Sequence, residues 1–360
     1  MRVLIAPDKF AGTLTAVQAA EAVAAGWRRH APDDELDLAP MADGGPGFVD
    51  VLHAALGGSL DAVTVSGPHG DPVPAVVLRV GTTAYVESAQ AAGLHLSSGP
   101  VETASSAGVG ELVLAAVAGG ATTVVVGLGG TGTNDGGAGV LAALGAQADG
   151  VLDGGAAPLG TVTTVDLSAA RSRLDGVTLV AASDVDNPLT GLFGATKTFG
   201  PQKGVAEDRI AEVDGWLEAF AAATDRRTSL EKGAGAAGGI GYALLVLGAS
   251  REPGIGLVAS AVSLADRARA SDLVVTGEGA FDFSSRAGKV PYGVAAVASE
   301  ALRPCIALAG QVLVGSREMR ALGIESAYSL VDLVGEERAF SAPADALADL
   351  AARVARTWSR

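Results

Sequence analysis

Short apolar runs alternate with helical patterns along most of the chain. At its two ends these runs are residues 3–6, 36–38, 273–276, 305–308 and 327–330. A helical pattern from about residue 15 to residue 30 separates the first two, and helices are expected between the others. Short apolar runs followed by helices are typical of buried, parallel strands. The pattern therefore predicts an α/β protein with largely parallel strands.

The middle of the chain carries strand candidates of its own, at residues 63–65, 75–78, 84–86, 122–127 and 178–182. We therefore expect two domains. Residues 1–60 and 260–360 would form a five-stranded, flavodoxin-like, doubly wound parallel sheet. Residues 61–259 would be an inserted second α/β domain that carries a glycine-rich loop.

Composition narrows the class of protein. The 360 residues are 49% hydrophobic and 18% charged, which is enough apolar material for one large core or two. The formal charge of −15 repels phosphate backbones and anionic membranes, so a nucleic-acid or membrane role is disfavoured. We expect a monomer or homodimer that acts on a small molecule.

Three features indicate a cytoplasmic protein. The single cysteine, Cys305, cannot form a disulfide within the chain, and no signal-peptide pattern opens the sequence. The charge-free stretch 112–134 is interrupted by Gly119 and Gly120, so it predicts a helix, a turn and a strand rather than a membrane span.

The most informative motif is the glycine-rich stretch 127–139, which lies between a Val-rich strand and a helix. Such a loop exposes backbone N–H groups to an anion, which favours phosphate binding. A tight structural turn is the alternative. The spacing of Gly127, Gly129 and Gly132 also fits a dinucleotide fingerprint, although that match is weak in a chain with 50 glycines.

Two further polar motifs follow. Asp184 and Asp186 come directly after the strand 178–182, where two carboxylates suit a divalent metal or a general base. An Asx turn ended by Pro188 is the alternative. Lys203 could neutralise a phosphate or be an ordinary surface lysine. The stretch 191–198 is not a Walker A motif, because Thr196 replaces the glycine required before the lysine.

Acidic and glycine residues also follow the strands at the chain ends. They are Asp8 and Lys9 after the first strand, Asp43, Gly44 and Gly45 after the second, and Glu278, Asp282, Gly288 and Lys289 after the third. Open α/β sheets bind ligands at this edge, so we expect a shared site. Each acidic residue, Asp43 in particular, could instead cap a helix. The glycines of 235–241 fit either close helix packing or ligand contact.

Seven ordered segments together resemble the bacterial glycerate kinase family: residues 6–14, 41–45, 129–139, 183–189, 199–204, 233–241 and 276–282 with 288–289. The resemblance covers nearly the whole chain. It implies a two-domain fold unlike that of P-loop kinases, with ATP and Mg²⁺ as cofactors. It also implies the phosphorylation of glycerate, typically to 2-phosphoglycerate.

Four positions depart from the family pattern. The family usually has Glu at Pro46, Arg at Ala280, His at Ala287 and Lys at Ala11, and Lys9 could compensate for the last. Loss of an Arg beside Glu278 could remove a clamp for the substrate carboxylate. The resemblance therefore implies glycerate or a related hydroxy acid as the substrate.

The expected roles follow from these motifs. We place phosphate binding on Gly129, Gly130, Thr131, Thr133, Asn134, Asp135, Gly136 and Gly137. Substrate contacts are expected from Asp43, Gly44, Gly45, Asn187, Glu278 and Asp282. We expect Asp184, Asp186 or Glu278 to bind the metal. The general base is expected to be Asp184 or Asp8. Lys9, Lys203 and Lys289 are expected to stabilise the negative charge of the phosphates.

Two other functions stay open at this point. A nicotinamide-dependent hydroxy-acid dehydrogenase would use the glycine fingerprint, but no acidic residue ends a clear second strand about 20 residues later. A nucleotide-binding protein without catalytic activity, or with a shifted substrate, would explain the missing Arg and Glu.

Overall fold

The computed structural model describes residues 1–10, 12–282 and 289–359, and the chain divides into two compact units. Unit 1 comprises Met1–Asp43, Asp50–Leu56 and Ile255–Arg360, and unit 2 comprises Gly44–Val49 and Gly57–Gly254. Unit 1 thus joins the two chain ends. That each unit folds as an independent domain stays a prediction.

The described part of unit 1 is built on one five-stranded sheet in which every strand pairing is parallel. Its order is β13-β12-β11-β1-β2. Numbered along the chain, this is the doubly wound order 2-1-3-4-5. The strands are β1 (Arg2–Ile5), β2 (Glu35–Leu38), β11 (Leu273–Phe281), β12 (Cys305–Val312) and β13 (Ser326–Ser329).

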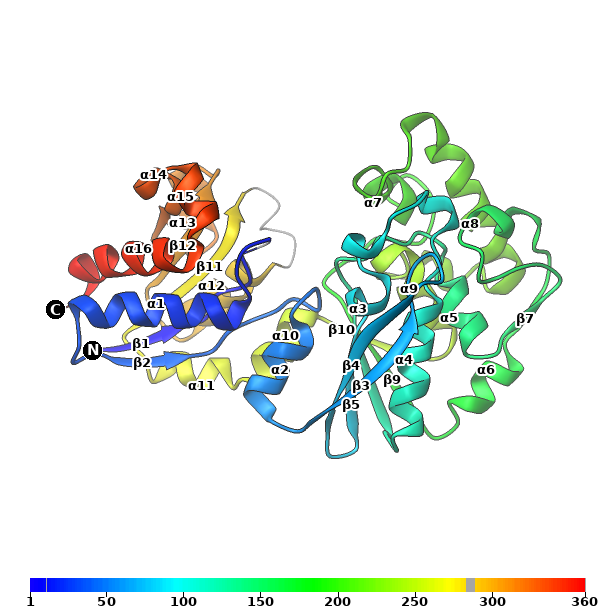
Figure 1. Cartoon of the computed structure of the whole chain (residues 1–360), viewed down its shortest axis with the longest axis horizontal. Coiled ribbons are helices and arrows are strands. Elements are labelled where there is room, and N and C mark those ends of the chain that lie inside the picture. The colour runs from blue at the N-terminus through cyan, green and yellow to red at the C-terminus, as the bar shows by residue number, and fades with distance from the viewer. Residues whose placement is uncertain (11, 283–288, 360) are drawn as a thin grey trace. The chain divides into compact units, whose positions relative to one another are not determined.

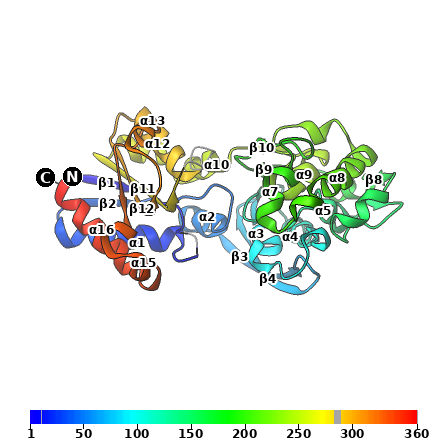
Figure 2. The ribbon, with the colours of Figure 1, turned by 90° about the horizontal axis from the view of Figure 1, so that it is seen from above.

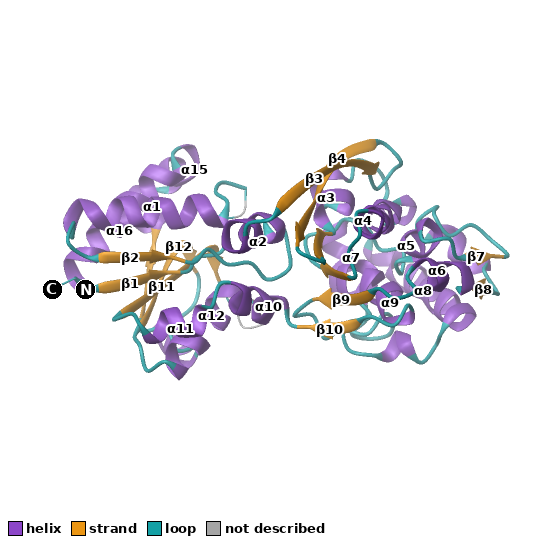
Figure 3. Cartoon of the chain, turned by 90° about the horizontal axis from the view of Figure 1, so that it is seen from below, coloured by secondary structure: helices purple, strands orange, loops and turns teal. Residues whose placement is uncertain are grey.

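Helices cover both faces of this sheet, with α1 and α16 on one face and α11 and α12 on the other (Figures 2 and 3). Val3, Leu4 and Ile5 of β1 have no exposed surface, as expected of a strand covered on both faces. The helices are α1 (Ala16–His30), α10 (Gly254–Ala261), α11 (Leu264–Arg269), α12 (Val290–Glu300), α13 (Ser316–Ala321), α14 (Leu330–Val334), α15 (Glu336–Ser341) and α16 (Pro343–Trp358).

Local sequence determines where α1 begins. The Thr15 hydroxyl accepts a hydrogen bond from the backbone N–H of Gln18, and the Gln18 side chain accepts one from the N–H of Thr15. This reciprocal capping box satisfies two N–H groups that a helix start would otherwise leave unpaired. The expected start near residue 15 agrees with this cap.

Within its described residues, unit 2 has a mixed six-stranded sheet of order β10-β9-β6-β5-β4-β3 (Figure 1). The strands are β3 (Ser59–Ser66), β4 (Pro72–Val80), β5 (Thr83–Glu87), β6 (Thr123–Gly127), β9 (Thr178–Ala182) and β10 (Ser250–Glu252). β5, β6, β9 and β10 are parallel, whereas β3, β4 and β5 pair antiparallel. A short two-stranded sheet of β7 (Gln147–Ala148) and β8 (Val165–Asp166) is separate.

The antiparallel pairings depart from the expected, largely parallel arrangement, and their cause is the length of the connections. Gly67 donates its N–H to the carbonyl of Asp71, and Gly70 has a φ of 87° in the turn between β3 and β4. Gly81, with a φ of 60°, lies in the two-residue connection between β4 and β5. Connections this short can join only antiparallel strands.

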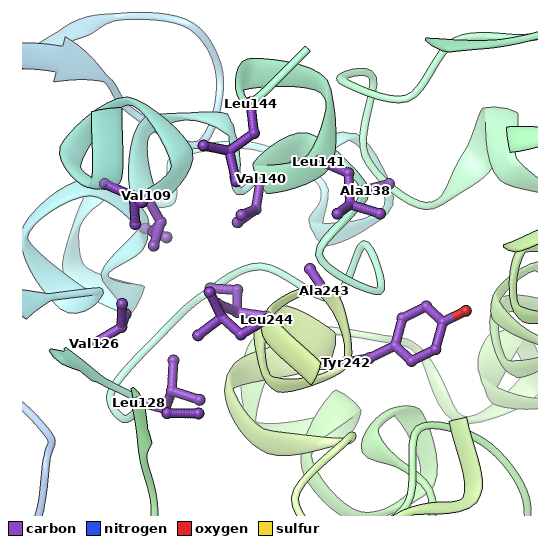
Figure 4. Close-up of a cluster of buried hydrophobic side chains, with 14 of the residues drawn as sticks. Val109, Val126, Leu128, Ala138, Val140, Leu141, Leu144, Tyr242, Ala243 and Leu244 are labelled. Carbon is purple, nitrogen blue, oxygen red and sulfur yellow. The ribbon is translucent and has the colours of Figure 1, made fainter. Parts of the chain in front are cut away.

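The core of unit 2 lies between its sheet and helices (Figure 4). Val126 of β6 and Leu128, just after the end of β6, contribute to one buried cluster with Val140 and Leu244. The helices are α3 (Ala89–Ala92), α4 (Ala107–Ala118), α5 (Ala138–Ala143), α6 (Ser168–Arg173), α7 (Ala195–Lys203), α8 (Ile210–Thr224) and α9 (Ile240–Val246), with short 3₁₀ turns at Leu94–Leu96, Val101–Thr103, Ala157–Thr161, Glu207–Arg209, Thr228–Leu230 and Ala236–Gly239.

One apolar stretch, Val101–Ala118, is long and apolar enough to cross a membrane by length and composition. It is not one continuous helix, because residues 104–106 separate a 3₁₀ turn from the 12-residue α4. Val109, Leu112 and Val113 of α4 have no exposed surface. A spanning helix needs about 20 residues, so we assign α4 as a core helix of unit 2.

One helix belongs to both units: α2 (Phe48–Leu56) begins in unit 2 and ends in unit 1. The Glu87 carboxylate at the end of β5 accepts hydrogen bonds from the N–H groups of Gly47 and Val49. A negative charge at a helix start satisfies unpaired N–H groups and complements the helix dipole. This contact explains why 44–49 belong to unit 2, whereas the sequence pattern predicts them in the N-terminal domain.

Candidate functional site

The carboxyl-terminal side of the unit 1 sheet holds a pocket of about 410 Å³. Asp8 follows β1, Asp43 follows β2, Glu278 lies on β11 and Gln311 lies on β12. The winding of the sheet reverses between β1 and β11, which is where doubly wound sheets bind ligands. The pocket thus brings together six residues from three separate motifs: Asp8, Lys9, Asp43, Glu278, Asp282 and Lys289.

Asp8 is the most perturbed group in this pocket. Its side chain is buried, and its Oδ1 lies 2.7 Å from the backbone N and 3.5 Å from the Nζ of Lys9. Burial raises the pKa of Asp8 to about 6, with a further contribution from Asp43 and opposition from Lys9. A carboxylate with a pKa just below neutral pH is suited to accept a proton.

The opposite charge in the pocket comes from Lys289. Its Nζ lies 4.0 Å from Glu278 Oε2 and 3.9 Å from Asp282 Oδ1. Glu278 is buried and Asp282 is partly exposed. Two other positions singled out in the sequence, Gly288 and Ala287, lie outside the described residues, as does Ala11.

In unit 2, the glycine-rich loop leaves β6 and enters α5. The Asp135 carboxylate accepts four hydrogen bonds inside the protein, from the N–H and hydroxyl of Ser106 and from the N–H groups of Gly137 and Gly139. Burial raises the pKa of Asp135, and these bonds act against the rise. Asp135 therefore shapes the loop, and its expected contact with the phosphates stays a prediction.

The same loop contains buried polar groups that have no partner. Thr133 Oγ1 and Asn134 Oδ1 are enclosed and accept or donate no hydrogen bond among the described residues. Within the described residues, no backbone hydrogen bond uses the N–H of Gly129, Gly130, Thr131, Thr133 or Asn134. Thr131, Thr133 and Asn134 are buried, and buried N–H groups are almost always paired, so these three residues provide donors for a bound group.

Lys203, at the end of α7, brings a positive charge to this loop. Its Nζ donates hydrogen bonds to the carbonyl of Thr133 at 2.7 Å and the hydroxyl of Thr131 at 3.3 Å. Burial lowers the pKa of Lys203 to about 8, although Asp135 acts in the opposite direction. The ammonium makes no ion pair with any described residue. It is therefore not the ordinary surface lysine that the sequence allowed.

A second glycine segment packs directly against the loop. Gly238 has a φ of 70°, and a Cβ there would lie 2.0 Å from the carbonyl oxygen of Thr133. A Cβ on Gly239 would lie 2.3 Å from the Cα of Gly136. Close packing, one of the two alternatives for 235–241, thus explains these two glycines.

The residues after β9 divide into two kinds. Gly127 pairs with Ala182, so the glycine-rich loop and the segment containing Asp184 leave the sheet at neighbouring points. Asp186 instead lies in an ion-pair cluster, with its carboxylate oxygens 2.6 Å from Arg251 and 3.0 Å from Lys232. These pairings lower the pKa of Asp186, the Lys232 contact contributing most.

Two asparagine side chains form hydrogen bonds at α7: Asn134 from the glycine-rich loop and Asn187 from the segment after β9. Asn134 donates its side-chain N–H to the Thr196 hydroxyl at 2.9 Å. Asn187 donates to the carbonyl of Phe193 at 2.7 Å and to the hydroxyl of Thr198 at 3.2 Å. These contacts position the helix that carries Lys203. Sequence reasoning missed the two threonines, which carry no signal other than their place in a helix rich in small polar residues.

Gly44 and Gly45 lie in the same part of unit 2. Gly44 has a φ of 92°, and a Cβ there would lie 2.8 Å from the carbonyl oxygen of Ala182. A Cβ on Gly129 would lie 2.8 Å from the Cα of Gly45. The two glycines allow the segment to approach β9 and the glycine-rich loop closely, and their expected contact with substrate stays a prediction.

No group of three or more His, Cys, Asp or Glu side chains arranged for a metal ion occurs in the described ranges. Mg²⁺ commonly uses only one or two protein carboxylates and takes its other ligands from water and substrate phosphates. Asp184, in the segment that leaves the sheet beside the glycine-rich loop, therefore fits Mg²⁺ as one such carboxylate, and Asp186 lies in the ion-pair cluster with Arg251 and Lys232.

The model of the glycerate kinase family matches residues 3–359. Glycerate 2-kinase of Escherichia coli is 38% identical over 99% of this chain and 98% of its own length, and glycerate kinase of Bacillus subtilis is 40% identical over 92% and 90%. An uncharacterized protein of Mycobacterium tuberculosis is 43% identical over 99% and 91%. A crystal structure from Salmonella typhimurium LT2, assigned as glycerate kinase 2, is 35% identical with a TM-score of 0.81 over 99% of this chain and 98% of that chain.

Proposed function

The chain belongs to the glycerate kinase family, and we propose that it uses ATP and Mg²⁺ to phosphorylate glycerate or a closely related hydroxy acid, with 2-phosphoglycerate as the product from glycerate. Relatives that carry the names glycerate kinase and glycerate 2-kinase support this proposal. The sequence departures at Pro46 and Ala280 are the reason for including related hydroxy acids.

The observation that carries the proposal is the partly buried ammonium of Lys203, which lies against the glycine-rich loop. A charge removed from water is disfavoured unless an opposite charge compensates it, yet among the described residues Lys203 donates hydrogen bonds only to the neutral oxygens of Thr131 and Thr133, and Asp135 acts on it without forming an ion pair. The unpaired N–H groups of the same loop require acceptors as well. The phosphates of a nucleotide would supply both the negative charge and the acceptors.

The residues present fit both cofactors. Thr133, Asn134 and the loop N–H groups would hold the phosphates together with Lys203, and Asp184 would hold Mg²⁺. The metal would neutralise charge that develops on the transferred phosphoryl group. The protein contributes a fixed arrangement of donors, which needs little reorganisation during the reaction.

The unit 1 pocket would bind the hydroxy acid. Lys289 and Lys9 provide charge for the substrate carboxylate, and Asp8 would accept the proton of the reacting hydroxyl. The raised pKa of Asp8 suits this role, because the group is ionised at neutral pH yet binds a proton readily. We prefer Asp8 to Asp184 as the base for this reason, and Asp184 is assigned to the metal.

One coupled assay tests the function and its rivals. ADP release is measured with ATP, Mg²⁺ and glycerate, lactate, tartronate or glycerol, and NAD reduction is measured with the same compounds. We expect ADP release that depends on glycerate and no NAD reduction. NAD reduction without ADP release would favour the dehydrogenase, and ATP binding without turnover of any acid would favour a non-catalytic nucleotide-binding protein.

The two aspartates after β9 should differ in effect. Asp184→Asn should lower turnover by about 10²-fold or more if its carboxylate holds the metal. Asp186→Asn should change turnover by less than about threefold and stability by less than about 1 kcal/mol, because it removes a largely exposed ion pair. Steady-state rates and thermal unfolding of both variants measure this. Equal loss of turnover in the two variants would contradict the division of roles.

Ala280 offers a test of substrate recognition. It lines the unit 1 pocket, opposite Gln311 in the register of β11 and β12. An Arg in a fork against a carboxylate contributes about 1.5–3 kcal/mol. Ala280→Arg should therefore lower the KM for glycerate by roughly ten- to a hundredfold. Ala280→Met is the control for size, and an equal effect of both variants would show that the charge is irrelevant.

A further inference from the structure

The unit 1 pocket is longer than a three-carbon acid requires. Its lining runs from Asp8 after β1, across Glu278 on β11 and Gln311 on β12, to Leu330 directly after β13. Neighbouring strands lie about 4.8 Å apart, so three spacings span about 14 Å. Glycerate has a backbone of only three carbons joined by bonds of about 1.5 Å. Glycerate therefore cannot reach from one end of the pocket to the other.

The two ends of the pocket differ in chemistry. The end at β1 and β11 carries the charged residues, including Asp8, Glu278 and Lys289. The far end, which we call the apolar end, consists of Leu330, Val331, Ala339, Phe340 and Pro343 from α14, α15 and the start of α16. Phe340 is 59% exposed although it lines the pocket, so an aromatic ring is left uncovered there.

We propose that the apolar end binds a non-polar substituent of the substrate, so that the preferred acceptor is a hydroxy acid with a phenyl-sized apolar group at the carbon furthest from its carboxylate. This inference rests on the proposed kinase function and on the hydroxy acid occupying unit 1. The charged end binds the carboxylate and hydroxyls, and the apolar end removes the substituent from water. Ala280, which has a small side chain, also lines this pocket.

The adenine ring of ATP is a less suitable occupant. The five side chains of the apolar end offer no hydrogen-bond donor or acceptor, and adenine would leave its amino group and ring nitrogens without side-chain partners there. Four carboxylates, Asp8, Asp43, Glu278 and Asp282, also line the pocket and would repel the several negative charges of a triphosphate more strongly than the single charge of the acid. A hydrocarbon group needs no hydrogen-bond partner and carries no charge that the carboxylates would repel.

The test compares three acids of graded length and polarity in the ADP-release assay: glycerate, 2,3-dihydroxy-3-phenylpropanoate and gluconate. The phenyl compound should have a kcat/KM at least tenfold above that of glycerate, because burial of a ring is favourable. Gluconate is similarly extended but polar, and it should show no such gain. Binding of the phenyl compound without ATP, measured by calorimetry, should be tighter than that of glycerate by a similar factor.

A matched pair of variants locates the effect. Phe340→Ala should lower the ratio of the two kcat/KM values, phenyl compound over glycerate, about tenfold. Leu302→Ala removes another exposed apolar side chain of unit 1, outside the pocket lining, and should leave the ratio unchanged. Thermal unfolding confirms that both variants are folded.

Three results would overturn the inference. If glycerate reacts as well as the phenyl compound and Phe340→Ala leaves their ratio unchanged, the inference fails and the proposed function stands. If Phe340→Ala raises the KM for ATP equally with every acid, the apolar end binds the nucleotide instead. If no acid, glycerate included, supports ADP release, the proposed function itself fails.

Discussion

Replacing Lys203 by methionine should lower kcat/KM for ATP by about 10³-fold or more. Methionine keeps most of the side-chain length but removes the charge that lies at Thr131 and Thr133. Groups that stabilise charge on a transferring phosphoryl contribute about 10²–10⁵ in rate, and more in a site that excludes water. The loss should exceed that of any other single substitution in unit 2.

The control for Lys203→Met is on the same helix. Lys197 is also part of α7, but its Nζ lies 3.5 Å from Asp214 and does not contact the glycine-rich loop. Lys197→Met should change kcat/KM by less than about threefold, with both variants folded by thermal unfolding. A similar loss in the two variants would show that the effect comes from general disturbance of α7.

The ionisation of Lys203 should make the affinity for ATP depend on pH. Burial lowers its pKa to about 8 in the protein without nucleotide. As the pH rises through 8, a growing fraction of the amine is neutral and no longer attracts phosphate. ATP affinity of the wild type should therefore fall between about pH 8 and 9, and calorimetry should show no such fall for Lys203→Met.

The second large effect is expected at Asp8. Asp8→Asn should lower kcat by about 10²–10⁴-fold, the usual range for loss of a general base. In the wild type, kcat/KM should fall tenfold for each pH unit below about 6, because protonated Asp8 cannot accept the proton. A rate profile that stays flat down to pH 5 would remove Asp8 from this role.

The same substitution should not weaken the fold. Burial raises the pKa of Asp8 from 3.8 to about 6, so the folded protein binds more protons at this group than the unfolded chain between those values. Folding stability therefore decreases as the pH rises through this window, by roughly 3 kcal/mol in total. The Asn side chain does not titrate, so the variant lacks this pH-dependent loss of stability. The variant should unfold at a higher temperature than the wild type at pH 7, and this advantage should disappear towards pH 4.

Much of the architecture follows from the order of apolar runs. The five runs at the chain ends correspond to β1, β2, β11, β12 and β13, which form one sheet. Strands such as Val3–Ile5 are buried on both faces, so their sequences are continuously apolar and easy to recognise. β10, with the sequence Ser-Arg-Glu, was missed because it is a polar edge strand of three residues.

The candidate site was less accessible to sequence reasoning. The motifs identified the loops, because glycine and acidic residues gather directly after the apolar strands, where parallel sheets bind ligands. They did not distinguish Asp184 from Asp186, which differ by their contacts with Arg251 and Lys232, residues remote along the chain. Likewise, the sequence could not show that Asp135 is held by Ser106.

The sequence by itself determined the α/β class, the discontinuous assembly of the parallel sheet and the resemblance to a kinase family, since these depend on local periodicity and on ordered motifs. The tertiary structure decided which charged groups are buried and which are paired. Lys203 shows the difference: its neighbours in the chain describe an ordinary helix end, whereas Thr131 and Thr133, about 70 residues away, enclose its ammonium. Burial and pairing depend on contacts between distant segments, and these contacts set the pKa and the chemistry of a side chain.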